Sequence, residues 1–273
     1  MPRFTAVFPT ANPLDILTVT KSVFRFVERV YRANTYISTN GILLSEIMLI
    51  QFTDYNSADE VIAQNYLQEW EQIESMLTEM PLYLKASDQK GKEGQPNFDP
   101  VGTNQFISDY LKRNGWLDTI PITPELDALG TDLDFGKNGI LMEAQFSNYP
   151  FLLNNVVRSE VLFRNLFQIG GTPVKLGIII TKGHMFPSSN STLYYEQAMH
   201  QIDFLDQFKI IDIPLRLIGL FEAYSNSTSA VWTKYHNTRY SRTVTKRDNI
   251  LCEIQRGRNG KNGKACRAKI QKK

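Results

Sequence analysis

The stretch from Asp134 to Asn148 limits the fold of this chain more than any other part of the sequence. Near its start, Asn138-Gly139 is the dipeptide that most strongly signals a tight β-hairpin turn, and an apolar run follows it at once. Such a turn joins two antiparallel strands. It therefore places Asp134, before the turn, beside Glu143, after the turn.

The second strand of this hairpin has two chemically different faces. Side chains two residues apart on a strand point the same way, so Glu143 and Gln145 share one face, which we expect to be exposed. Met142, Ala144 and Phe146 share the other face and point into a core. Two carboxylates and an amide oxygen on one face make a site for a hard cation such as Mg²⁺. Metal-dependent phosphodiester cleavage uses this arrangement.

The composition is that of an ordinary globular protein. Of the 273 residues, 42% are hydrophobic and 21% are charged, which suits one large domain with a full core. The longest apolar run, residues 41–52, is too short to cross a bilayer, and the N-terminus lacks the pattern of a secretory signal. Two cysteines near the C-terminal end do not make a disulfide framework. We therefore expect a cytoplasmic protein.

Charge is distributed unevenly along the chain, although the formal net charge is only +2. Residues 255–273 contain basic side chains and no acidic ones, and the rest of the chain is mildly acidic. The C-terminal segment is rich in Gly, Asn and Lys and lacks apolar periodicity, so residues 249–273 are predicted to be a disordered basic tail. Such a tail would add non-specific affinity for DNA.

Apolar periodicity predicts helices and strands in alternation. A capping-box pattern, Ser57 to Glu60, starts a helix that ends before Pro81, and further helices are expected at about 104–113, 152–167 and 194–208. Apolar runs predict buried strands at 174–181 and 213–222. This alternation indicates an α/β core around a mixed sheet. Residues 1–52 are interpreted as an N-terminal extension of unknown role.

The spacing of Asp134, Glu143 and Gln145 is only moderately specific by itself, because acid pairs on hairpins are common. A nuclease superfamily has an acid, a variable gap and then Asp/Glu-x-Lys on a strand, but this chain has Gln145 in place of the lysine. Longer blocks of sequence decide the question. They lie at residues 98–105, 129–136, 143–155, 180–187 and 239–248.

These blocks closely resemble the BglII family of type II restriction endonucleases, a branch of the PD-(D/E)XK superfamily that also has Gln in place of Lys. The resemblance runs from about Thr53 to Asp248. It implies a restriction-endonuclease-like core, with a central mixed β-sheet flanked by helices, and a smaller β-sandwich-like subdomain. Residues 53–248 are then the endonuclease domain.

The resemblance also implies roles for the hairpin residues. Asp134 and Glu143 match the metal-binding carboxylates, and Gln145 matches the third catalytic residue. The backbone carbonyl of Ala144 would complete the shell of one or two Mg²⁺ ions. Asp132, two residues before Asp134, could share its face or be a structural acid.

Base recognition is expected from six matching residues. Asn offers the paired donor and acceptor that fit adenine, Arg fits the two acceptors of guanine, and Ser fits either. For the segment 188–192 alone, capping of the following helix would be the simpler interpretation. The six residues are Ser147, Asn148, Asn190, Ser191, Tyr240 and Arg242.

The function that the resemblance implies is cleavage of double-stranded DNA by a homodimer at AGATCT, after the first A, leaving four-base 5′ overhangs. A DNA methyltransferase would be a functional partner in the same cell. Two alternatives stay open: a nuclease with a different or relaxed GATC-containing site, and a DNA-binding protein that does not cleave. Arg158 could contact a phosphate or a dimer interface. Lys137 and Lys182 could touch phosphates, but by default we expect them to be solvated charges.

Overall fold

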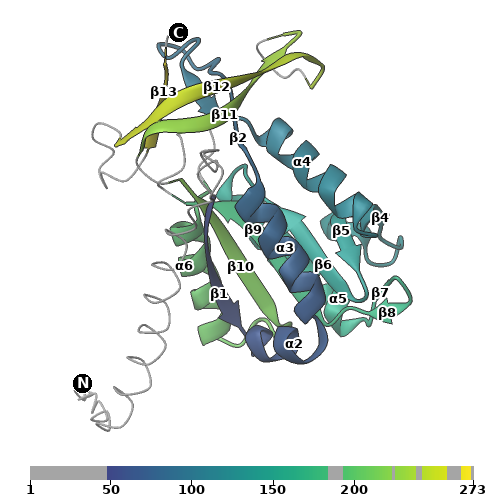
Figure 1. Cartoon of the computed structure of the whole chain (residues 1–273). Coiled ribbons are helices and arrows are strands. Elements are labelled where there is room, and N and C mark those ends of the chain that lie inside the picture. Colours follow the sequence, from purple (N-terminus) through teal and green to yellow (C-terminus); the bar gives the residue numbers. More distant parts are fainter. Residues whose placement is uncertain (1–47, 184–192, 223–224, 238–241, 257–265, 272–273) are drawn as a thin grey trace, which may run out of the picture. The chain divides into compact units, whose positions relative to one another are not determined.

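The computed structural model describes residues 48–183, 193–222, 225–237, 242–256 and 266–271, which lie within one compact unit, Ser45–Lys273. Its core is a mixed α/β arrangement (Figure 1). Among the helices in these ranges, none is long and apolar enough to span a bilayer.

A six-stranded mixed sheet forms the centre of the fold. Its middle strands β6, β9 and β10 run parallel, and β1, β5 and β4 are antiparallel to their neighbours. The strand order is β1 (Leu49–Tyr55), β10 (Leu215–Phe221), β9 (Leu176–Lys182), β6 (Ile140–Ala144), β5 (Asp132–Lys137) and β4 (Leu117–Pro121).

Helices cover both faces of this sheet (Figure 1). Because neighbouring side chains of a strand point to opposite faces, Ile178 and Ile180 of β9 pack into one core while Ile179 packs into another. A strand buried on both faces is a continuous apolar run, as in β9. The first core contains α2 (Ala58–Asn65), α3 (Leu67–Glu79) and α4 (Pro100–Arg113), and the second contains α5 (Tyr149–Arg164) and α6 (Tyr195–Gln207).

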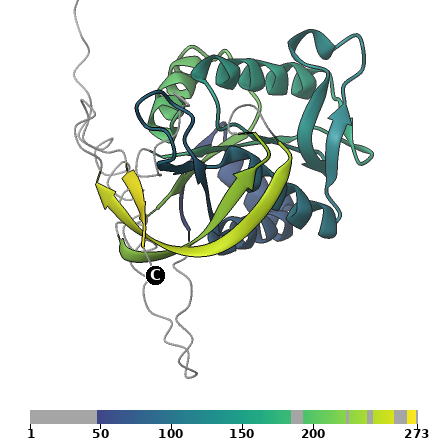
Figure 2. The same cartoon turned by 90° about the horizontal axis from the view of Figure 1, so that it is seen from above.

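A second, five-stranded sheet forms the smaller β subdomain (Figure 2). Its order is β13 (Cys266–Ile270), β12 (Val244–Arg256), β11 (Ser225–Tyr235), β2 (Leu82–Ala86) and β3 (Pro96–Phe98). The remaining short elements are the 3-10 helix η1 (Asp127–Leu129), β7 (Gln168–Ile169) and β8 (Thr172–Pro173).

The prediction of a disordered tail from residue 249 is wrong for the part of the tail that the structure describes. Residues 249–256 continue β12, and β13 pairs with it in antiparallel register. Cys252 and Ile254 of β12 are buried in the first core. Their alternate positions are a strand signal that the abundance of basic residues obscured. The central sheet also begins at Leu49, inside the expected extension 1–52.

The expected helices and strands are present with shifted ends. The helix expected from Ser57 to Pro81 is two helices, α2 and α3, which meet at Tyr66. Ser57 precedes α2 but has a left-handed backbone (φ 57°), and no capping bond from its side chain is seen within the described residues, so the capping-box prediction is wrong.

Arg216 of β10 is a buried charged residue that forms an ion pair with Asp54 of β1. Its Nε and Nη2 donate to the two carboxylate oxygens of Asp54 at 2.6 and 2.7 Å. The guanidinium also lies 4.2 Å from the ring centroids of both Phe52 and Trp70. Arg216 is 4% exposed, so this pair is screened little by water.

We expect Asp54→Ala to lower the free energy of unfolding by about 3–5 kcal/mol, because it leaves a buried guanidinium without its counter-charge. Urea unfolding of the purified variant measures this. The matched control is Asp212→Ala, which breaks the exposed pair with Arg164 and should cost at most about 1 kcal/mol. Equal costs for the two variants would contradict the assignment of Asp54–Arg216 as a stabilising pair.

Candidate active site

The predicted hairpin is confirmed and is formed by β5 and β6. The strands pair in antiparallel register, with Lys137 opposite Ile140. Asn138 and Gly139 have φ values of 50° and 84°, and positive φ at both central residues is the requirement of a type I′ turn. Continuing the register away from the turn sets Asp134 opposite Glu143.

The two faces of β6 are also as predicted, except that neither face is open to solvent. Met142, Ala144 and Phe146 pack in the first core. Glu143 points to the other face, but it is only 3% exposed, so the expectation of an exposed acidic face is wrong. The local sequence correctly predicted the direction of this side chain. The side chain of Glu143 is covered by α5, the helix that follows β6 in the chain.

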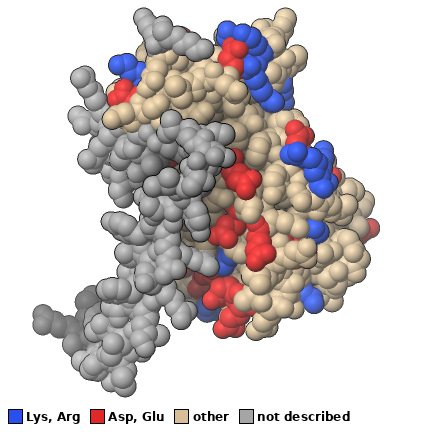
Figure 3. Space-filling view, in the orientation of Figure 1, with Lys and Arg blue, Asp and Glu red and all other residues tan. Residues whose placement is uncertain are grey.

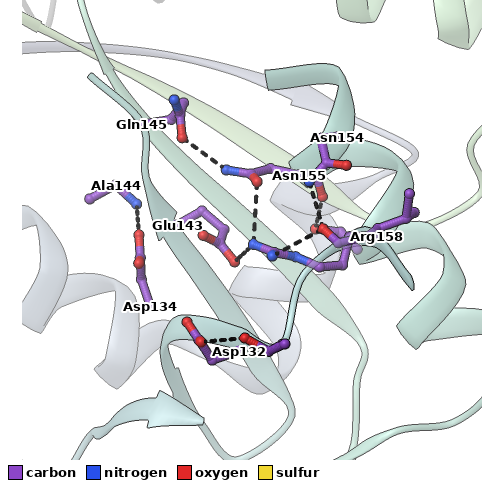
Figure 4. A network of polar contacts seen from close by, with 11 residues as sticks. Asp132, Asp134, Glu143, Ala144, Gln145, Asn154, Asn155 and Arg158 are labelled. Atoms are coloured by element: carbon purple, nitrogen blue, oxygen red, sulfur yellow. Dashed lines mark hydrogen bonds and ion pairs between the residues drawn. The ribbon is translucent and has the colours of Figure 1, made fainter. Parts of the chain in front are cut away.

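Each of the two carboxylates is held by a defined donor (Figure 4). The backbone N–H of Ala144 donates to Oδ2 of Asp134 at 2.9 Å. Nη2 of Arg158 donates to Oε1 of Glu143 at 2.6 Å, and both side chains of this pair are buried. The structure therefore resolves the open question about Arg158, which contacts a carboxylate of the candidate site inside its own chain.

Arg158 and Asn155 extend the site along α5. Asn155 accepts a hydrogen bond from Arg158 Nη2 at 3.2 Å and donates to Oε1 of Gln145 at 3.1 Å (Figure 4). Asn155 was not among the residues predicted for the site. Its signal was the i, i+3 spacing of Asn155 and Arg158, which places the two polar side chains on one face of the helix.

Gln145 is fixed at both ends of its amide group. Its oxygen accepts from Asn155, and its nitrogen donates to the hydroxyl of Ser147. A neutral side chain held in this way can orient a water molecule. It cannot supply the positive charge that a lysine at the same position would bring.

The electrostatics of the site are those of two acids in a low-dielectric environment. Burial, followed by the charge of Asp134, raises the pKa of Glu143 to about 8, although Arg158 acts in the opposite direction. Burial is also the largest cause of the raised pKa of Asp134. One guanidinium therefore does not neutralise both carboxylates, and an added cation between them would be favoured.

The donor set fits a hard divalent cation. Oxygen ligands from carboxylates and carbonyls are what Mg²⁺ binds in proteins, and here Asp134, Glu143 and the carbonyl of Ala144 are neighbours on paired strands. In the described ranges, no group of three or more Asp, Glu, His or Cys side chains could hold a metal. Asp132 is exposed and accepts a hydrogen bond from the Thr131 hydroxyl.

The structure describes three of the six residues predicted to read bases. Ser147 and Asn148 are exposed, and they connect the end of β6 to α5. Arg242 is exposed and precedes β12, a strand of the second sheet. Asn190, Ser191 and Tyr240 lie outside the described residues. The structure thus brings the catalytic candidates together with Ser147 and Asn148.

Comparisons with known proteins agree with this fold. The family model of restriction endonuclease BglII/BglIII matches residues 50–220. The chain is 53% identical to the type II restriction enzyme BglII of Bacillus subtilis over 207 residues, which is 76% of this chain and 92% of that protein.

Solved structures give the same result. A crystal structure of BglII complexed with a DNA 16-mer superposes with a TM-score of 0.77 at 48% identity, covering 82% of this chain and all of that one (100%). A crystal structure of free BglII superposes with a TM-score of 0.61 at 46% identity, covering 82% and 99%. The chain therefore belongs to the BglII/BglIII family of type II restriction endonucleases, enzymes that cleave DNA at specific sequences.

Proposed function

We propose that this enzyme cuts both strands of the palindrome AGATCT after the first A and leaves four-base 5′ overhangs, with Mg²⁺ as the cofactor. The observation that carries the chemistry is the pair of carboxylates on adjacent strands, half-buried Asp134 and buried Glu143, both with raised pKa values. The specificity is supported by the 53% identity to BglII. A methyltransferase of the same specificity is the proposed functional partner.

The residues of the chain have separate tasks in this proposal. Asp134, Glu143 and the Ala144 carbonyl hold the cation, which when bound would lower the pKa of a water molecule and stabilise charge on the scissile phosphate. The Ala144 N–H orients Asp134, and Arg158 orients Glu143. Gln145, fixed by Asn155 and Ser147, orients the attacking water.

The charge distribution supports DNA on the side of the sheet that carries the carboxylate pair. The opposite side is covered by α3, which contains Glu69, Glu71, Glu74 and Glu79 and no Lys or Arg. Acidic side chains accordingly gather over the middle of the face seen in Figure 3. Phosphates are repelled by such a surface.

Digestion of a fully sequenced plasmid with the purified protein and Mg²⁺, followed by sequencing of the ends, tests this function. We expect ends confined to AGATCT. Asp134→Ala should cut at least about 100-fold more slowly, because a metal ligand is missing. Its binding to the same site in Ca²⁺ should be kept or tightened, since a carboxylate that repels phosphate is gone.

The matched control for that variant is Asp132→Ala, which removes an exposed acid two residues away on the same strand and should leave cutting intact. Cutting by Asp134→Ala at the wild-type rate would refute the site assignment. Ends at a wider set such as GATC would keep the chemistry and change the specificity. Binding without any cutting would make this protein a DNA-binding relative of the enzymes.

Arg242→Ala should reduce discrimination at one base pair by about 1–3 kcal/mol, the contribution of a good bidentate contact to guanine. Cleavage rates of duplexes with single substitutions measure this. The control is Arg247→Ala, which removes an exposed positive charge from the same sheet and should leave discrimination unchanged. If Arg242→Ala weakens cleavage of all duplexes equally, Arg242 contacts a phosphate instead.

We also propose that the enzyme acts as a homodimer, because a two-fold axis in the protein would match the palindrome and give one active site per strand. An apolar stripe on α5 supports this proposal. Tyr149, Leu153 and Val157 follow one another at the spacing of one helical turn, and all three are exposed although large and apolar. Phe151 and, on the neighbouring α6, Phe204 add to the exposed apolar surface.

Leu153→Glu should therefore convert the dimer to a monomer at micromolar concentration, because a carboxylate would be buried at the interface without a partner. Sedimentation velocity measures the oligomeric state. Leu67→Glu on α3 is the matched control, since Leu67 is also an exposed leucine on a helix but does not lie on α5. A dimer that survives Leu153→Glu would place the interface elsewhere.

A further inference from the structure

Lys182, the last residue of β9, is fully buried (0% exposed), which is rare for lysine. The expectation that it is a solvated charge is wrong. Its Nζ donates to the carbonyl oxygen of Leu193 at 2.6 Å and lies 3.8 Å from the ring centroid of Tyr194. Burial lowers its pKa to about 7, while the charge of Glu196 favours the ammonium form. None of the catalytic contacts described above involves this side chain.

The contact of Lys182 continues through the backbone of one residue, Leu193, to Ser147 and Asn148, which we call the reader segment. The N–H of Leu193 donates to the carbonyl oxygen of Ser147 at 3.1 Å. Leu193 itself is fully buried in the second core. Two backbone groups of Leu193 thus connect the end of β9 to Ser147, which follows β6 and is one of the exposed candidates for base recognition.

The end of β9 is a rigid support for this connection. The N–H of Gly183 donates to the carbonyl oxygen of Leu220 at 2.7 Å. A Cβ atom added to Gly183 would lie 2.2 Å from the ring of Phe221, so no larger residue fits there. Phe221 in turn packs edge-on against Tyr195. The ammonium therefore reaches Leu193 from a fixed position.

We propose that Lys182 is a positioning residue for base discrimination: by holding the Leu193 carbonyl, it fixes the backbone of Leu193 and, through the N–H of that residue, the backbone of Ser147 and Asn148. This proposal rests on the proposed function of Ser147 and Asn148 as base readers. An ammonium group is suited to the task because it is a strong donor on a side chain long enough to cross from the strand to the neighbouring segment. A displaced reader segment would still contact DNA but would distinguish bases less well.

The test is Lys182→Met, which keeps the length and apolar stem of the side chain and removes its donor. Cleavage rates are measured for the AGATCT duplex and for the set of duplexes with one substituted base pair. We expect the ratio of cognate to substituted rates to fall at least about tenfold, the discrimination supplied by one good base contact. A loss of stability alone would lower all rates together and leave this ratio unchanged.

Lys137→Met is the matched control. Lys137 also donates to a backbone carbonyl, that of Asn114 at 2.9 Å, and lies 6.0 Å from the ring centroid of Trp116. Lys137 differs from Lys182 in its location: it lies at the turn of the β5–β6 hairpin, and Lys182 lies beside the reader segment. We expect Lys137→Met to keep the wild-type ratio.

Three outcomes are distinguishable. A folded Lys182→Met variant with the wild-type ratio overturns the role of Lys182. If thermal unfolding shows that Lys182→Met does not fold, Tyr194→Leu decides: it removes the ring beside the ammonium and should lower the ratio several-fold, and an unchanged ratio overturns the proposal. Wild-type protein that shows no preference for AGATCT overturns the proposed function instead, before any variant is compared.

Discussion

The burial of Glu143 is the constraint on which the rest of the site depends. A carboxylate that is 3% exposed and next to a second acid is unstable as an anion unless positive charge and hydrogen bonds compensate it. Arg158 supplies one charge, and the remaining deficit makes the site attractive to a divalent cation. The packing of α5 meets this requirement: Leu152, Val156 and Leu162 are buried in the apolar cores, and Arg158 contacts Glu143.

The replacement of lysine by Gln145 changes how such a site must work. A lysine would stabilise charge on the scissile phosphate directly, whereas the amide of Gln145 can only orient groups. The guanidinium of Arg158 does not take over that task, since it is engaged with Glu143 and Asn155. In the proposed mechanism, a bound cation would provide most of the electrostatic stabilisation. The two hydrogen bonds of Gln145 hold its amide group in one orientation.

The parallel pairing of β6 and β9 links the candidate catalytic residues to the candidate base readers. In open α/β sheets, binding sites form beyond the carboxyl ends of parallel strands. Here Ala144 of β6 pairs with Ile180 of β9, so the chain leaves both strands at the same edge. Gln145 and Ser147 follow one strand and Lys182 ends the other, with Leu193 joining them. A shift of the reader segment would therefore change the orientation of the Gln145 amide, which is hydrogen-bonded to Ser147.

The sequence by itself determined the features that depend on neighbouring residues. Asn138-Gly139 specified the turn, and strand alternation then set Glu143 and Gln145 on one face and Met142 and Ala144 on the other. The family blocks predicted the central mixed sheet. Only the tertiary structure decided that Glu143 is buried, that Arg158 and Asn155 complete its surroundings, that Lys182 is enclosed and that residues 249–256 are a strand. These features depend on contacts between segments distant in sequence, so the local signals at Asn155, Arg158, Cys252 and Ile254 were not sufficient to predict them.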